Sequence, residues 1–360
     1  MRSPAPKKIL FVVLNWGLGH ACRSVPILTD LQNRGIEIII ASDGIALTYL
    51  KKQFPKAEYL ELPSYDIHYR GKQLTLSLLM QSPKILKAVF EEQKILKAYI
   101  KKHQIDGLIS DNRFGTMGLS IPSVYITHQI MLPISSLTFA YIANKVHHFI
   151  ISRHDQLWIA DHPGNLSLAG PLSRAKAFPK ADYLGCLSSL NFSTQKRKFD
   201  ITFILSGPEP QRSTFEKIIL SQIPRLKNKE ILLVRGSDLE LGSKATNQGK
   251  GFTQINMASR EELNTLINQS QFVICRSGYT SIMDIYKLQK KCLFVPTPGQ
   301  KEQEVLAEYH NKIFDIPFQK QQEFDIVKAL KQIRSSRPQF MEQWKYDNVD
   351  FLVSSWLETL

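Results

Sequence analysis

The chain has 360 residues, of which 43% are hydrophobic and 22% are charged, a composition that excludes disordered and fibrous proteins. Its length predicts two domains, because a single core rarely grows beyond about 250–300 residues. The four cysteines are widely spaced and form no C-x-x-C pair, which argues against a disulfide scaffold or a Cys-ligated zinc site and favours a reducing cytoplasm.

Positive charge is concentrated in the first part of the chain. Residues 1–200 hold 25 Lys and Arg against 14 Asp and Glu, whereas residues 201–360 hold 21 against 18. Such a basic half implies an anionic partner, such as nucleic acid, anionic lipid or a phosphorylated substrate. The alternative is a basic face that is simply solvated. No zinc finger, RNP-type aromatic motif or basic helix-turn-helix is present, so a nucleic-acid partner is not expected.

The first half begins as a β-α-β unit. Residues 7–14 form an aliphatic run typical of a buried parallel strand, and a helix at 23–35 and a second strand at 36–42 follow. A right-handed crossover and a parallel sheet are therefore predicted. Further along, we expect a helix from Pro83 to Gln104 and strands at 106–110 and 121–127. The first apolar run holds only six residues, so we expect neither a signal sequence nor a membrane span.

A polar stretch after Gly185 reads as a linker to a second β-α-β series. The expected strands are 199–207, 230–237, 272–278 and 291–299, and the expected helices are 213–223, 260–270 and 280–288. The sequence thus predicts an α/β protein with two Rossmann-like parallel-sheet domains. We place the domains at residues 1–195 and 196–340, with a final helix at 341–360 that packs back on the first domain.

The segment N-W-G-L-G-H at residues 15–20 lies between a strand and a helix. Gly17 and Gly19 would let the backbone approach a ligand at the helix N-terminus. The segment is not G-x-G-x-x-G, and no acidic residue ends the next strand in the ribose-binding position, so a dinucleotide site is disfavoured. His20 is a candidate general base or acceptor-binding residue; the alternative is a histidine that only caps the helix.

A second motif is R-S-G-Y-T-S-I-M-D-I-Y at 276–286, with F-V-P-T-P-G-Q-K-E-Q-E at 294–304. Arg276, Ser277 and Gly278 end a strand and open a helix, so free backbone amides there suit a diphosphate. Asp284 is a candidate acceptor for ribose hydroxyls, and Gln303 offers both a donor and an acceptor to a sugar. No D-x-D motif occurs in the chain, so we expect no metal site and no cofactor beyond a nucleotide-sugar co-substrate.

These motifs resemble the donor-binding half of GT-B glycosyltransferases of the MurG type, which transfer N-acetylglucosamine from a UDP-linked donor. The first loop matches except that Trp16 replaces a glycine, Asp284 replaces the commoner Glu, and Glu304 stands where a second Gln is frequent. The resemblance implies a GT-B fold whose domains face an interdomain cleft, and an inverting hexosyl transfer from a nucleotide sugar. The donor-binding residues that it implies are Ser206, Gly207, Arg235, Met257, Arg276, Ser277, Gly278, Asp284, Gln303 and Glu304.

For the acceptor side, the candidates follow the strands of the first half. His20 or Asp111 is expected to deprotonate an acceptor hydroxyl, and Gly17, Gly19 and His128 are expected to bind the acceptor. Two alternatives stay open: a nucleotide-sugar 2-epimerase-like enzyme, and a non-catalytic protein of the same fold that binds a glycan or a lipid surface.

A membrane-surface site is a further hypothesis. The helix after Pro83 places lysines at helical spacing, and residues 131–153 are apolar on most faces and end in basic residues. Basic helices beside an apolar patch are typical of docking on anionic membranes, so we expect a cytoplasmic protein that binds a glycan or lipid-linked acceptor peripherally at the inner face of the membrane. The alternative is a pair of ordinary core helices with their lysines outward.

Overall fold

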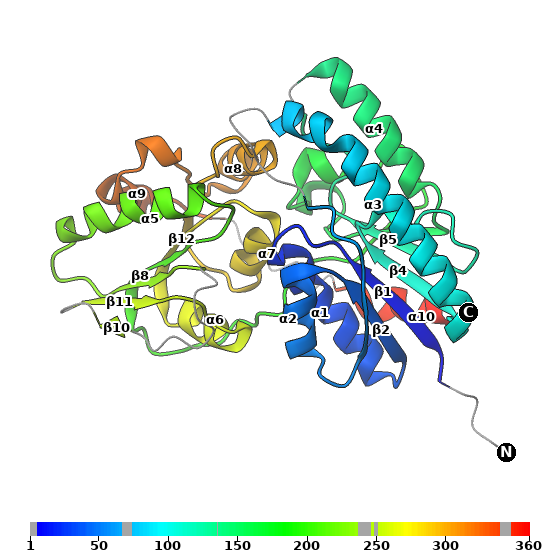
Figure 1. Cartoon of the computed structure of the whole chain (residues 1–360). Coiled ribbons are helices and arrows are strands. Elements are labelled where there is room, and N and C mark those ends of the chain that lie inside the picture. Colours follow the sequence, from blue (N-terminus) through cyan, green and yellow to red (C-terminus); the bar gives the residue numbers. More distant parts are fainter. Residues whose placement is uncertain (1–5, 67–73, 135, 237–245, 248–250, 339–346) are drawn as a thin grey trace. The chain divides into compact units, whose positions relative to one another are not determined.

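The computed structural model describes residues 6–66, 74–134, 136–236, 246–247, 251–338 and 347–360. The chain divides into two compact units, one made of residues 1–187 and 343–360 and the other of residues 188–342 (Figure 1). The boundary falls before the predicted position at 195, because the backbone N–H groups of Asn191 and Ser193 already bond to side chains of the second unit. They donate to Asn264 Oδ1 at 2.9 Å and Asn268 Oδ1 at 3.1 Å.

The first unit contains a parallel sheet with the strand order β3-β2-β1-β4-β5-β6-β7. Its central strands are continuous runs of aliphatic residues, because helices cover both of their faces and leave no solvent-facing positions. The predicted parallel sheet of this half is confirmed. The strands are β1 (Lys8–Val13), β2 (Glu37–Ser42), β3 (Glu58–Glu61), β4 (Gly107–Asp111), β5 (Ser123–Thr127), β6 (Gln156–Ile159) and β7 (Asp182–Tyr183).

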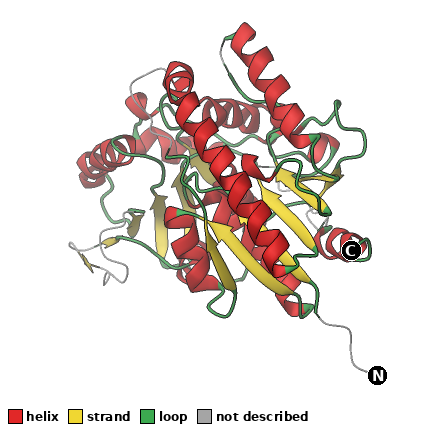
Figure 2. Ribbon diagram, turned by 45° about the vertical axis from the view of Figure 1, so that its right-hand side comes forward, coloured by secondary structure: helices red, strands yellow, loops and turns green. Residues whose placement is uncertain are grey.

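Helices of the first unit pack on this sheet (Figure 2). Leu96 of α3 joins Leu10, Ile39 and Leu108 of the strands in one apolar cluster. Helix α3 begins earlier than predicted, at Leu74, because the leucine-rich segment before Pro83 has a strong helix propensity and the proline lies inside the helix. The helices are α1 (Leu18–Asn33), α2 (Gly44–Gln53), α3 (Leu74–His103), α4 (Leu137–Ile151) and α10 (Val349–Leu357), with 3₁₀ turns at η1 (Phe114–Thr116), η2 (Gly164–Leu166) and η3 (Gly170–Ser173).

The C-terminal helix packs within the first unit but is shorter than the predicted 341–360. It begins at Val349, after Asn348, whose backbone N–H donates to Leu184 O at 3.1 Å. Residues 339–346 lie outside the described residues. Trp356 is fully buried, with its ring edge-on to Trp158 at a centroid distance of 6.1 Å. Gly107 leaves space for this indole, since a Cβ there would lie 2.8 Å from it.

The second unit contains a sheet with the strand order β10-β11-β9-β8-β12-β13, in which only the short pairing of β10 with β11 is antiparallel among the described strands. The predicted second parallel-sheet domain is confirmed. Its strands are β8 (Phe199–Ile204), β9 (Ile231–Val234), β10 (Thr246–Asn247), β11 (Phe252–Ile255), β12 (Ser270–Cys275) and β13 (Cys292–Phe294). Its helices are α5 (Gln211–Gln222), α6 (Arg260–Asn268), α7 (Tyr279–Lys287), α8 (Lys301–Phe314) and α9 (Ile326–Ser335), with 3₁₀ turns η4 (Ile223–Arg225) and η5 (Gln321–Glu323).

Candidate active site

The polar residues of the first unit gather at the carboxyl edge of its sheet. Val13 pairs with Asp111 in the β1–β4 register, and Asp111 pairs with Ile126 of β5, so the ends of three neighbouring strands meet there. Helix α1 starts at the same edge after Gly17, whose φ of 76° lies in the left-handed region that favours glycine. This geometry brings five side chains into one cluster, which we call the Asp111 cluster: His20, Arg23, Ser24, Asp111 and His128.

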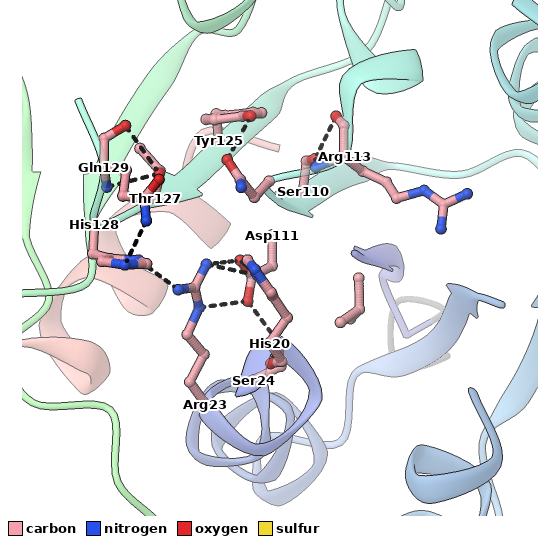
Figure 3. Close-up of polar contacts among 12 residues, drawn as sticks. His20, Arg23, Ser24, Ser110, Asp111, Arg113, Tyr125, Thr127, His128 and Gln129 are labelled. Atoms are coloured by element: carbon pink, nitrogen blue, oxygen red, sulfur yellow. Dashed lines mark hydrogen bonds and ion pairs between the residues drawn. The ribbon is translucent and has the colours of Figure 1, made fainter. Parts of the chain in front are cut away.

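Asp111 is the centre of that cluster and is almost fully buried (Figure 3). Its Oδ1 lies 3.0 Å from His20 Nδ1, and its Oδ2 accepts from Arg23 Nε at 2.9 Å. Arg23 also donates to Oδ1 through NH2, and Ser24 Oγ donates to Oδ2 at 3.1 Å. The predicted catalytic pair, His20 and Asp111, is therefore brought together by the fold.

The surroundings of Asp111 and His20 lower the pKa of both residues, with different consequences for their roles. Burial alone would raise the pKa of Asp111, but the positive charge of Arg23 and the bond to His20 outweigh it and hold the pKa well below its usual range. Burial, followed by the charge of Arg23, lowers the pKa of His20. Asp111 is thus a fixed anion that is unsuited to accept a proton, whereas His20 is neutral near pH 7. Of the two predicted bases, only His20 fits that role.

His128, a predicted acceptor-binding residue, lies on the other side of the arginine. Its Nδ1 is 2.7 Å from Arg23 NH1, and its side chain is buried. Because an arginine has only donors, His128 Nδ1 accepts this bond, and His128 Nε2 lies 3.4 Å from Gln129 Nε2. Gly17 is exposed and Gly19 is half-buried in the first turn of α1, beside His20 in sequence.

Arg23 is not among the site residues predicted from the sequence. The available signal was its spacing: residues three apart on a helix share a face, so an arginine at i+3 from His20 points to the same edge of the sheet.

A second buried network supports the loop that follows Asp111. Arg113, which is fully buried, donates to Asp43, to Glu92 Oε1 at 3.2 Å and to Pro63 O at 2.7 Å. Tyr65 Oη donates to Glu92 Oε2 at 2.5 Å. Burial raises the pKa of Glu92. This network ties the ends of β2 and β4 to α3 and thereby fixes the edge that carries the Asp111 cluster.

In the second unit, the loops after β8, β12 and β13 meet at the carboxyl edge of the sheet. Ser206 and Gly207 are exposed, and Gly207 has a φ of 97°, so glycine is required there. A Cβ on Gly207 would lie 3.3 Å from Thr297 Oγ1, which places this loop against the one after β13. Gly278 precedes α7, and a Cβ there would meet open space. The helix start therefore leaves room for a ligand beside its backbone.

Arg276 supports these loops from inside. Its guanidinium donates to Val295 O at 3.1 Å, Gln211 O at 3.1 Å and Gln321 Oε1 at 2.6 Å, and it stacks on Phe215. Burial lowers its pKa to about 10. The side chain is buried and bonded to carbonyls, so its observed role is to fix the loops rather than to face a diphosphate directly.

Asp284 lies in α7 and is buried against Arg260. Arg260 NH1 donates to Oδ2 at 2.8 Å and NH2 donates to Oδ1 at 2.9 Å, while Ser188 Oγ donates to Oδ1 at 2.6 Å. Arg260 Nε also donates to Ser189 Oγ at 3.1 Å. Asp284 is thus held by an arginine and by the first residues of the second unit, neither of which the sequence motif indicated.

The remaining predicted donor residues differ in what they contact. Gln303 Oε1 accepts from Thr297 N at 2.9 Å and its amide nitrogen donates to Gln300 Oε1, while its backbone O accepts from Ser277 Oγ at 2.7 Å. Gln303 and Ser277 therefore brace the loop after β13. Glu304 is half-buried and lies 3.4 Å from Lys301 Nζ.

Arg235 and Met257 follow β9 and β11 in the second unit. Arg235 pairs with the buried Glu216 and donates to Asn256 Oδ1 at 3.0 Å. Its charge is therefore already matched by a carboxylate, which weakens the case for a phosphate contact. Met257 is half-buried in the adjacent loop.

Comparisons with known proteins agree with this architecture. Residues 202–347 match the model of the glycosyltransferase family 28 C-terminal domain. An uncharacterized glycosyltransferase of Methanosarcina acetivorans is 24% identical, and the match covers 82% of this chain and 81% of that one. The crystal structure of MurG from Acinetobacter baumannii is similar over 99% of this chain and 100% of that chain, with a TM-score of 0.59 and 14% identity. The spinosyn rhamnosyltransferase SpnG, solved with thymidine diphosphate, is similar over 98% and 96%, with a TM-score of 0.58 and 13% identity. The predicted fold class is confirmed.

Proposed function

We propose that this chain transfers a hexose-type sugar from a UDP-linked donor to an acceptor hydroxyl, with inversion. The premise is that the chain is a glycosyltransferase of the MurG type with the GT-B fold. The observation that carries the proposal is the bond between His20 Nδ1 and Asp111 Oδ1 at 3.0 Å. A neutral histidine whose Nδ1 is held by a buried carboxylate presents Nε2 as a base, which is the group that an attacking hydroxyl needs.

In the proposed reaction, His20 Nε2 takes the proton of the acceptor hydroxyl while the hydroxyl oxygen bonds to the anomeric carbon. The bond from that carbon to the donor diphosphate breaks, and the nucleoside diphosphate leaves with the electron pair. Asp111 stabilises the imidazolium that forms. A positioned base of this kind contributes about 10²–10⁴ in rate.

We place the donor on the second unit. The backbone amides at the start of α7 and the exposed Ser206–Gly207 loop are suited to a diphosphate, because a helix N-terminus favours negative charge. In the proposal this site replaces a divalent cation, in keeping with the absence of D-x-D from the sequence. A nucleotide also appears in the printed name of a structural neighbour, SpnG with thymidine diphosphate.

Asp284 remains the proposed ribose ligand. A carboxylate offers about four lone-pair sites, and Arg260 and Ser188 occupy three of them. The remaining site can accept from one ribose hydroxyl. Because Gln303 is occupied by its own loop, we assign the contact with the donor sugar to Glu304, which is only half-buried at the start of α8.

The acceptor side of the proposal includes an anionic membrane at the inner face of the cell envelope. Helix α4 buries Asn144, His147, Ile150 and Ile151, but its other face carries apolar side chains that are half or more exposed. They are Leu137, Tyr141, Ile142, Val146 and Phe149. Lys145 and Arg153 lie over the rings of Tyr141 and Phe149. A mixed apolar and basic helix face of this kind is suited to the lipid headgroup region. In the helices that the structure describes, no segment is long and apolar enough to cross a bilayer.

The proposal is tested by thermal unfolding with UDP, dTDP and GDP, followed by assays of UDP-sugar consumption with glycan and lipid-linked acceptors. A ligand that binds the folded chain raises its apparent stability by mass action, so we expect a selective shift with UDP. The His20→Ala variant should keep that shift and lose about 10²–10⁴ of turnover. No shift with any nucleotide would overturn the donor assignment. A 2-epimer as the product, rather than a glycoside, would replace transfer by epimerisation.

A further inference from the structure

Thr297 follows β13 at the carboxyl edge of the second sheet, and its hydroxyl is buried without a hydrogen-bond partner. The residue is 1% exposed, and Oγ1 forms no hydrogen bond with the residues that the structure describes. Burying a hydroxyl without a partner is unfavourable, and such groups are rare enough in folded proteins to call for an explanation. The proposed reaction assigns no task to this side chain.

The loop around Thr297 holds the side chain in a fixed place. Thr297 N donates to Gln303 Oε1 at 2.9 Å, and Thr297 O accepts from Gln300 N at 3.0 Å. The carbonyls of the two preceding residues accept from Arg276 NH1 at 3.1 and 3.4 Å. A threonine side chain is also stiff about χ1, because two heavy atoms branch from its Cβ. The backbone of Thr297 is therefore bonded within the loop, and its hydroxyl is the group that is left to meet a ligand.

Both backbone segments proposed to bind the donor diphosphate lie against this loop. Thr297 Oγ1 is the nearest atom to a Cβ built on Gly207, at 3.3 Å, so the hydroxyl faces the Ser206–Gly207 segment. The start of α7 is bonded to the same loop, because Ser277 Oγ donates to Gln303 O at 2.7 Å. A Cβ on Gly278 would meet open space, so a ligand has room beside this helix start. All of these residues belong to the second unit.

A phosphate oxygen is a suitable partner for such a hydroxyl. The oxygens of an ionised phosphate only accept hydrogen bonds, and a threonine hydroxyl has one hydrogen to donate. A hydrogen bond to an ionised acceptor is about twice as strong as one between neutral groups. The backbone amides that face the same space are donors as well, so an acceptor-only group is matched from several sides.

We propose that Thr297 is a donor-binding residue whose hydroxyl donates a hydrogen bond to a phosphate oxygen of the nucleotide sugar, beside the Ser206–Gly207 segment. This inference rests on the proposed function, because it takes the diphosphate site of the second unit as its starting point. It adds a side-chain contact to a site that otherwise consists of backbone amides.

The test compares Thr297→Val with the wild-type full chain, by calorimetric titration and urea unfolding. Valine replaces the hydroxyl with a methyl group of similar volume, and the affinity for UDP should fall about 10–100-fold, which is the contribution of a hydrogen bond to a charged group. UDP-glucose should lose affinity by the same factor, whereas uridine should bind equally to both proteins. The urea midpoint of the unliganded variant should not fall, because no hydrogen bond within the protein is lost. Thr297→Ser keeps the hydroxyl and should retain most of the UDP affinity.

Thr202→Val is the matched control, since Thr202 is also a fully buried threonine of the second unit, on β8. Its Oγ1 lies 2.6 Å from Ser270 Oγ and is bonded within the protein. This variant should lower the urea midpoint and leave the UDP affinity unchanged. A Thr297→Val midpoint that falls as far as that of Thr202→Val would show that the hydroxyl of Thr297 is bonded inside the protein, and would overturn the inference.

The titrations also separate this inference from the proposed function. Equal UDP affinity in the wild type and Thr297→Val overturns the inference alone, and a loss confined to UDP-glucose does the same by assigning the hydroxyl to the sugar. If the wild type binds neither UDP nor UDP-glucose, the donor assignment fails together with the inference. If the UDP results are as expected but the product is a 2-epimer, the proposed transfer fails and the phosphate contact of Thr297 stands.

Discussion

Arg260 and Asp284 form a bidentate ion pair in the second unit, with nitrogen–oxygen distances of 2.8 and 2.9 Å, and both side chains are close to 10% exposed. The carboxylate that is proposed to bind ribose therefore also contributes to the stability of the fold. Any substitution at Asp284 changes the folding free energy as well as ligand affinity, and these two effects have to be measured separately.

Asp284→Ala should lower the free energy of unfolding by about 3–5 kcal/mol, because it leaves Arg260 with an uncompensated, largely buried charge. Its affinity for UDP should also fall, since a hydrogen bond to a charged group contributes about 1.5–3 kcal/mol. Urea unfolding and calorimetric titration of UDP measure the two effects. Arg260→Gln is the control: it perturbs the same pair but keeps the carboxylate. Equal UDP affinity in the wild type and Asp284→Ala would remove Asp284 from the donor site.

Asp111→Asn should destabilise the first unit by about 3–5 kcal/mol at pH 7, since it leaves the buried Arg23 without its anion. The folded-state pKa of Asp111 lies below its ordinary value, so its contribution is present above the unfolded pKa near 3.9. That contribution is lost as the pH falls through the folded pKa. The stability difference between wild type and variant should therefore be constant from pH 7 to about 5 and should shrink in more acidic solution. A difference that grows on acidification would contradict this account.

Chelation by EDTA should leave the rate of sugar transfer unchanged. The proposed diphosphate site consists of backbone amides at the start of α7 and of the Ser206–Gly207 loop, so no cation is required to neutralise the leaving group. The measurement is UDP release with and without EDTA, and with added Mg²⁺ or Mn²⁺. Loss of turnover that either metal restores would disprove the amide-based account.

Gly107→Ala should destabilise the first unit, because the added methyl group would meet the rigid ring of Trp356 at 2.8 Å and Leu360 Cδ1 at 3.1 Å. Overpacking of this kind costs about 1–3 kcal/mol, and Trp356→Ala should cost about 3–5 kcal/mol. Denaturant unfolding of both single variants and the double variant checks this. The double variant should be less destabilised than the sum of the singles; strict additivity would mean that the two sites do not interact.

Replacing Val146 and Phe149 by Ser should reduce binding to anionic vesicles, whereas the wild type should bind them at low salt and leave them at high salt. The exposed face of α4 supplies apolar area, and each nearby Lys or Arg contributes about 1 kcal/mol at an anionic surface. Phe351→Ser is the control, because Phe351 is also an exposed aromatic residue but lies on α10. Co-sedimentation with neutral and anionic vesicles is the measurement. Equal recovery with both vesicle types, or equal loss in the control, would exclude α4 as the docking face.

The sequence by itself determined the two parallel sheets and the positions of their functional loops. Continuous aliphatic runs such as 7–14 are found where helices cover both faces of a strand, and glycines such as Gly17 and Gly207 mark the loops because each has a positive φ. The meeting of His20 with Asp111 was also foreseeable, since both follow strands whose carboxyl ends share one edge.

Only the tertiary structure decided which partners these residues have. Arg23 binds Asp111 across 88 positions, and Asp284 is shared by Arg260 and Ser188. Such pairings depend on register and side-chain direction, which local propensity does not encode. The same holds for Arg276 and Gln303: a motif shows that a polar residue follows a strand, but burial and the nearest carbonyl determine whether it faces a ligand or braces a loop.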